Sequence, residues 1–156
     1  MGKVKLLLFV VLAAFFGAST GFAAEKCFEA NLTSKGQVKK PNSTASGKAT
    51  FKRSEDKKTM SYRLYASGIT DATAVQIHIG RKGVDGPAVI VIPFGGEKKG
   101  KVNGLLSEGK ITDMDLLGQL QGKPLDELVR HIKAGNVYVN IHSYGNPNGE
   151  IRGQIM

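Results

Sequence analysis

The stretch that decides the fold lies at the C-terminus, where residues 137–143 read VYVNIHS and residues 149–155 read GEIRGQI. In both runs apolar and polar residues alternate, and this period of two is typical of a β-strand with one buried face. The residues between them, YGNPN at 144–148, are rich in turn formers. The pattern therefore predicts an antiparallel hairpin.

The alternation also predicts the register of this hairpin. With Ser143 opposite Gly149, the apolar face holds the pairs Ile141–Ile151, Val139–Gly153 and Val137–Ile155. The other face then holds the polar pairs His142–Glu150, Asn140–Arg152 and Tyr138–Gln154. A slip of one residue would mix isoleucine with glutamate on one face, so the pattern specifies the parity of the register.

Working outward, five more short strands are predicted, all rich in β-formers and separated by turn residues: 27–34, 45–53, 59–66, 72–79 and 88–92. The chain contains no internal repeat of useful length. About seven short strands with regular turn signals favour a mainly β, antiparallel β-sandwich.

Two helical segments interrupt the strands. Thr112 with Asp115 three residues later favours a short helix over 113–117 by capping-box logic. A longer helix is predicted over 124–134, because four apolar side chains share one helical face: Leu125, Leu128, Val129 and Ile132. Gly135 would end it. We expect this helix to be a crossover packed on the sandwich, with Leu128 and Ile132 in the core.

The N-terminus has the three parts of a secretory signal peptide. Lys3 and Lys5 precede an apolar run at 6–16, and small residues follow, so we predict cleavage after Ala23. The run is shorter than the ~20 residues that a membrane anchor needs. Lipidation of Cys27 is disfavoured because Glu25 and Lys26 precede it. The prediction is a signal peptide over 1–23, one domain over 24–156, a secreted or periplasmic location, and no transmembrane segment after cleavage.

The single cysteine and the net charge limit the disulfide bonds and the partners that the protein can have. Cys27 cannot close an intrachain disulfide, so an intermolecular bridge and a half-buried thiol on the first strand both remain open. Loss of Lys3 and Lys5 would lower the formal net charge from +9 to +7. The other lysines gather at 35–58 and 98–101, which favours an anionic envelope polymer or an acidic protein as partner, or else a merely solvated surface. Aromatic residues are not interleaved with them, which argues against nucleic acid.

Three segments resemble the CHRD domain, the module named after chordin. They are VQIHIG at 75–80 with the strand AVIVI at 88–92, ITDMD at 111–115 with the following helix, and VYVNIHS at 137–143 with the NP and GEIRG that follow it. The resemblance implies an immunoglobulin-like β-sandwich in an extracellular or envelope protein, and the helix predicted over 124–134 adds one short crossover to it. It implies no general enzymatic activity, so we expect a non-enzymatic binding or structural module without a cofactor.

The candidate site is a cluster on the polar strand faces: Gln76, His78, Asn140, His142, Glu150 and Arg152. If the strands are neighbours, His78, His142 and Glu150 converge, and two imidazoles with a carboxylate suit Zn²⁺ or Cu²⁺. The alternative function is thus copper or zinc binding through His78 and His142. Against it, CHRD members often carry a second histidine where this chain has Gln76, and the same side chains can satisfy one another in a structural network.

No catalytic residues are predicted. The glycines at 80, 83 and 86 are not followed by the Gly-Lys-Ser/Thr of a phosphate loop. The serines at 61, 67 and 143 lack the context of a nucleophile elbow.

Overall fold

The computed structural model describes residues 27–156. The predicted signal peptide and its cleavage after Ala23 lie outside these residues. The described chain forms seven strands, one α-helix and three 3-10 turns, in the order β1 (Cys27–Thr33), η1 (Ser34–Gly36), β2 (Ser46–Arg53), β3 (Met60–Ile79), β4 (Ala88–Val91), β5 (Lys98–Ile111), η2 (Asp113–Asp115), η3 (Gly118–Leu120), α1 (Leu125–Lys133), β6 (Val137–Ser143) and β7 (Asn146–Gln154). Among these residues no helix is long and apolar enough to cross a membrane.

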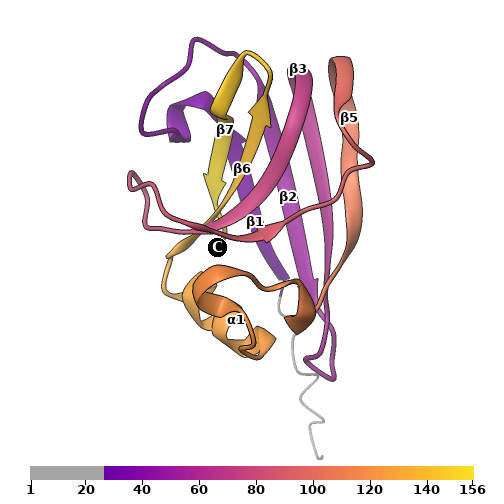
Figure 1. Ribbon diagram of the computed structural model, residues 1–156, viewed down its shortest axis with the longest axis vertical. Helices are drawn as coiled ribbons and strands as arrows, with labels where there is room; N and C mark the ends of the chain where they lie inside the picture. The colour runs from indigo at the N-terminus through magenta and orange to yellow at the C-terminus, as the bar shows by residue number, and fades with distance from the viewer. Residues whose placement is uncertain (1–26) are drawn as a thin grey trace, which may run out of the picture.

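All strand pairs are antiparallel, and five strands close into a barrel (Figure 1). β3 pairs with β2 through its first half and with β6 through its second half. β6 pairs with β7, and β7 meets β1 at Thr33–Arg152. Just past the end of β7, two backbone hydrogen bonds join Met156 to Glu29 of β1. The five strands of the barrel are thus β1, β2, β3, β6 and β7. β4 and β5 also pair with β3 but lie outside the barrel.

The prediction of a mainly β, antiparallel fold is confirmed, but a clear immunoglobulin-like sandwich is not what forms. The strands predicted at 59–66 and 72–79 are one continuous strand, β3, which turns at Gly68 and Asp71, both with positive φ. Because this long strand pairs on both halves, it joins what would be two sheets into one barrel.

β5 was not predicted. Its sequence, KKGKVNGLLSEGKI, is rich in lysine and glycine and lacks the alternation of a half-buried strand. It forms by pairing along β3, from Met60–Ile111 to Ala72–Lys98, with three register shifts on the way. Tertiary pairing therefore overrides a weak local preference.

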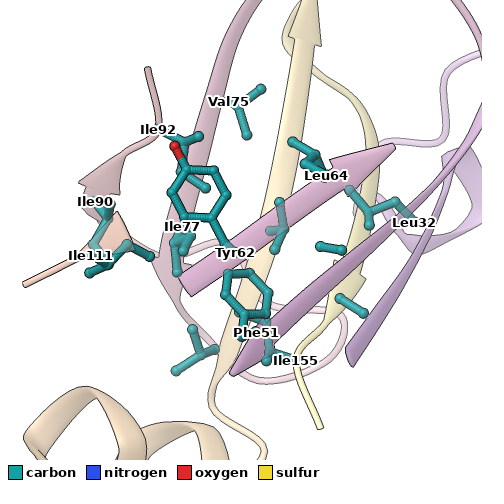
Figure 2. Close-up of a cluster of buried hydrophobic side chains, with 14 of the residues drawn as sticks. Leu32, Phe51, Tyr62, Leu64, Val75, Ile77, Ile90, Ile92, Ile111 and Ile155 are labelled. Atoms are coloured by element: carbon teal, nitrogen blue, oxygen red, sulfur yellow. The ribbon is translucent and has the colours of Figure 1, made fainter. Parts of the chain in front are cut away.

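The core fills the barrel with side chains from alternate strand positions. Figure 2 shows Phe51, Tyr62, Leu64, Val75 and Ile77 converging there, each at most 5% exposed. The helix α1 lies at one end of the strands (Figure 1) and buries the predicted face: Leu125, Leu128, Val129 and Ile132. The helix predicted at 113–117 shortens to η2, where Asp115 Oδ2 accepts hydrogen bonds from the N–H and Oγ1 of Thr112 at 2.7 and 2.9 Å.

The C-terminal hairpin has the predicted register over most of its length. The observed pairs are Tyr138–Gln154, Val139–Gly153, Asn140–Arg152 and Ile141–Ile151. Near the turn the prediction is wrong, because the ladder shifts after Ile141 and Ser143 pairs with Asn146 instead of Gly149. The expected five-residue loop contracts to a turn at Tyr144–Gly145, and the His142–Glu150 pair is not part of the ladder.

Candidate functional site

The predicted polar cluster lies on the outer face of the barrel, where β3, β6 and β7 run side by side. Val75, Ile77 and Ile141 point inward and are at most 1% exposed, and the residues between them point outward. Two loops, 34–45 and 80–87, lie on this side of the barrel (Figure 1). They cover the outer face, so four of the six predicted residues are buried: His78, Asn140, Glu150 and Arg152.

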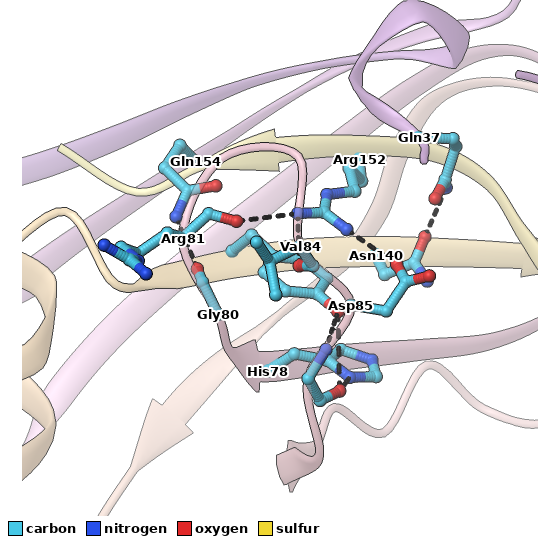
Figure 3. A network of polar contacts seen from close by, with 11 residues as sticks. Gln37, His78, Gly80, Arg81, Val84, Asp85, Asn140, Arg152 and Gln154 are labelled. Atoms are coloured by element: carbon cyan, nitrogen blue, oxygen red, sulfur yellow. Dashed lines mark hydrogen bonds and ion pairs between the residues drawn. The ribbon is translucent and has the colours of Figure 1, made fainter. Parts of the chain in front are cut away.

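Arg152 holds the loop 80–87 in place. Its guanidinium is 2% exposed and donates from Nη2 to the backbone carbonyls of Arg81 and Val84, at 3.2 and 2.9 Å (Figure 3). Nη1 forms an ion pair with Asp85 at 3.0 Å, and Cζ lies 3.7 Å from the centre of the Tyr138 ring. This combination of fork-shaped hydrogen bonding and stacking is specific to arginine.

Three other polar residues on the hairpin fasten the covering loops. Gln37 Nε2 donates to Asn140 Oδ1 and Ser43 Oγ donates to Glu150 Oε1, both at 2.6 Å, so the loop 34–45 is fixed at two points. Gln154 Nε2 donates to the carbonyls of Gly80 and Gly135 at 2.7 Å. Asn140, Glu150 and Gln154, with Arg152, are called the bracing residues below.

The two strand histidines have a different arrangement. The His78 ring stacks on Tyr138 with ring centres 4.8 Å apart and an interplanar angle of 5°. Its Nδ1 lies 2.8 Å from the Gly86 carbonyl, and His142 Nδ1 lies 2.9 Å from the Pro147 carbonyl. The two imidazole centres are 6.3 Å apart. Burial, helped by the charges of His142 and Arg152, lowers the pKa of His78 below its usual value of 6.5.

The structure assembles only part of the metal site that the sequence suggested. His78 and His142 do approach each other, but Glu150 is engaged with Ser43. Within residues 27–156 no group of three or more His, Cys, Asp or Glu side chains could hold a metal ion. Gln76 is half-buried opposite Asn140 on the same face. The exposed Cys27 thiol lies at the start of β1.

Several members of this site were not predicted from the sequence. Tyr138 was expected on the polar face, but only as a partner of Gln154, and it stands at the centre of the cluster between Arg152 and His78. Gln37, Ser43 and Asp85 come from loops, and Gln37 and Ser43 lie more than 100 residues from the side chains that they contact. Local patterns carry no signal for contacts of this range.

The covering loops are strongly basic. They carry five exposed cationic side chains, Lys35, Lys39, Lys40, Arg81 and Lys82, and their one acidic residue, Asp85, is paired with Arg152. Within the described residues, no ion pair joins any of the five to a carboxylate. An open groove of about 660 Å³ runs between the loops along the β1–β7 seam, lined in part by Lys35, Lys82 and Arg152.

Comparison with known proteins identifies a family for this chain. No curated protein and no solved structure matches the chain significantly. The family model of the CHRD domain matches residues 28–155, which is well over half of the 156 residues and nearly all of the described part. The match spans the barrel, the helix and both covering loops, so the chain belongs to the CHRD domain family.

Proposed function

We propose that this protein is an exported, non-enzymatic binding module whose two covering loops bind an anionic polymer of the cell envelope, in the periplasm or outside the cell. Membership of the CHRD family supports a small binding or structural module, because such domains occur in extracellular and secreted proteins. Export rests on the signal-peptide pattern of residues 1–23.

The observation that carries the proposal is the charge of the covering loops. Five exposed cations lie on two neighbouring loops, and none of them is paired with a carboxylate of residues 27–156. Uncompensated charges of one sign attract a polyanion over about one Debye length, ~8–10 Å at physiological salt. On the barrel itself, Lys48 is paired with Glu29 at 2.9 Å.

The bracing residues also support the proposal, because they hold both covering loops in place. Because Arg152, Asn140, Glu150 and Gln154 fix both loops to the barrel, the loop cations sit on a scaffold that is already ordered. Binding to a preorganised surface loses less conformational entropy than binding to mobile loops. These polar side chains are thus used to hold the loops, which is why we assign them no catalytic role.

The test compares two triple variants with equal loss of charge. Lys35→Gln/Lys39→Gln/Lys40→Gln removes three cations from one covering loop, whereas Lys98→Gln/Lys99→Gln/Lys101→Gln removes three from β5. The probes are polyphosphate and polygalacturonate, with neutral dextran as the uncharged polymer, and the readout is the Kd from fluorescence anisotropy or calorimetry.

We expect the loop variant to bind both polyanions at least tenfold more weakly, the β5 variant to bind them nearly as the wild type does, and dextran to bind to none. Equal losses in the two variants would show a diffuse charge effect and overturn the assignment to the loops. Absence of polyanion binding by the wild type at 50 mM salt would overturn the proposal itself.

A further inference from the structure

The bracing network leaves two side-chain nitrogens unused. Within the described part of the chain, the Nε2 atoms of His78 and His142 are inaccessible to solvent and have no hydrogen-bond partner. A buried polar atom without a partner is unusual in a folded protein and calls for an explanation. Both atoms belong to neighbouring imidazoles, whose centres are 6.3 Å apart.

Backbone contacts determine which nitrogen of each ring is free. The Gly86 and Pro147 carbonyls can only accept hydrogen bonds, so the Nδ1 atoms facing them at 2.8 and 2.9 Å carry the protons. In the neutral imidazole Nε2 then holds a lone pair. A histidine that donates from Nδ1 to a carbonyl while its Nε2 stays free has the arrangement found in metal-bound histidines.

The spacing of the rings suits a shared ion. With metal–nitrogen bonds of about 2.0–2.1 Å and about 1.2 Å from Nε2 to the ring centre, two imidazoles joined to one ion through Nε2 have ring centres about 5–6.5 Å apart, and the widest spacing corresponds to a linear bond angle. The observed 6.3 Å lies at the linear end of this range. His142 is half-exposed beside the Tyr144–Gly145 turn, so the two rings lie close to the surface of the barrel.

We propose that His78 and His142 form a two-coordinate site for a monovalent d¹⁰ ion, Cu(I), bound through their two Nε2 atoms. Two nitrogen ligands in a line satisfy Cu(I), whereas Zn²⁺ takes four ligands in structural sites and three protein ligands in catalytic ones. The site does not depend on polyanion binding by the loops, and either proposal can fail alone.

The charges around the site also favour a monovalent ion. The groups nearest His78 are the ring of Tyr138, the cationic Arg152 that stacks on that ring, and Asp85, whose charge Arg152 already balances. Within residues 27–156 no group of three or more His, Cys, Asp or Glu side chains could hold a metal ion, so no carboxylate joins the two imidazoles in a site for a divalent ion.

The experiment uses variants that keep the hydrogen bond to the backbone carbonyl and remove the metal ligand. Asparagine can place its amide nitrogen near the position of Nδ1, so His78→Asn and His142→Asn retain a donor for the carbonyl and lack Nε2. His131→Asn, on α1, is the matched control. All proteins carry Cys27→Ser, because the exposed thiol is itself a soft copper ligand.

Full-length chains are expressed, purified as the host processes them, and titrated anaerobically with Cu(I) against a chromophoric Cu(I) chelator. We expect one Cu(I) per chain in the Cys27→Ser protein and in the His131 variant. His78→Asn and His142→Asn should each lose at least a hundredfold in affinity. X-ray absorption should show two nitrogen neighbours and no sulfur.

Three results would overturn the proposal: no Cu(I) held by the Cys27→Ser protein, equal affinity in the double variant His78→Asn/His142→Asn, or displacement of Cu(I) by equimolar Zn²⁺. If the variants do not fold, ¹⁵N spectra of the histidine rings decide on the Cys27→Ser protein alone. Cu(I) should shift two Nε2 resonances and leave both Nδ1–H protons in place. A shift confined to His131 would exclude the site.

Discussion

Replacement of Arg152 gives the sharpest test of how the covering loops are held. Arg152→Met keeps an unbranched side chain against Tyr138 and removes the guanidinium that binds the carbonyls of Arg81 and Val84. Asp85→Asn removes only the other half of the ion pair. Because Asp85 is 71% exposed, solvent screens that pair heavily.

Arg152→Met should lower the free energy of unfolding several-fold more than Asp85→Asn does. Each hydrogen bond from a charged donor contributes about 1.5 kcal/mol at the low end of its range, and stacking of a desolvated cation on Tyr138 adds about 1–2 kcal/mol. Methionine recovers part of the packing, so Arg152→Met should lower the free energy of unfolding by about 3 kcal/mol. An exposed ion pair contributes about 0–1 kcal/mol, so Asp85→Asn should cost under about 1 kcal/mol.

The assay is urea denaturation followed by far-UV circular dichroism, with hydrogen exchange on the loop 80–87. In Arg152→Met the amides of Val84 and Gly86, which donate to Arg81 O and Tyr138 Oη, should exchange faster well before global unfolding. Arg152→Lys, which keeps the charge but loses the planar fork, should lie between the other two. Equal costs for Arg152→Met and Asp85→Asn would refute the reasoning, because the ion pair and not the carbonyl contacts would then hold the loop.

Two further predictions concern pH and the tight fold of the same loop. Burial lowers the pKa of His78 in the folded state, so below pH 6.5, the ordinary pKa of a histidine, the unfolded state binds more protons than the folded state. The contribution of His78 to the free energy of unfolding should therefore be complete above pH 6.5 and decline as the pH falls towards the folded pKa. In urea unfolding between pH 7.5 and 5.5, the free energy of unfolding of His78→Asn should change less with pH than that of the wild type. A Cβ on Gly86 would lie 1.7 Å from the Ile79 carbonyl oxygen, whereas one on Gly145 would meet nothing within 4 Å. In the same assay, Gly86→Ala should therefore lower the free energy of unfolding by more than about 2 kcal/mol and Gly145→Ala by under about 0.5 kcal/mol. Similar losses in the two variants would contradict the packing described for the loop.

The sequence was most informative where one face of an element is buried. The alternation in VYVNIHS and GEIRGQI predicted the hairpin and its register from Tyr138 to Ile141, because a shift of one residue would have buried glutamate. The helical face of α1 was predicted for the same reason. β5 was missed because its stability comes from pairing with β3 and not from its own lysines and glycines.

The outward direction of the polar cluster was also predictable, but its burial was not. The alternation along the strands places His78, Asn140 and Arg152 on the face away from the core, and this holds whichever loops cover that face. That Gln37 and Ser43 reach back to Asn140 and Glu150 depends on contacts across more than 100 residues. The barrel likewise depends on β3 continuing through Gly68 and Asp71, where the local sequence favours a break.

The salt dependence of polyanion binding tests the central claim most directly. Kd values for polyphosphate are measured by calorimetry from 25 to 300 mM NaCl, on the wild type and on Lys35→Gln/Lys39→Gln/Lys40→Gln. If the covering loops bind anionic polymer through their cations, the affinity of the wild type falls steeply as salt screens these charges, and the slope is clearly shallower in the variant. Binding that is insensitive to salt, or equal slopes in the two proteins, would contradict the account.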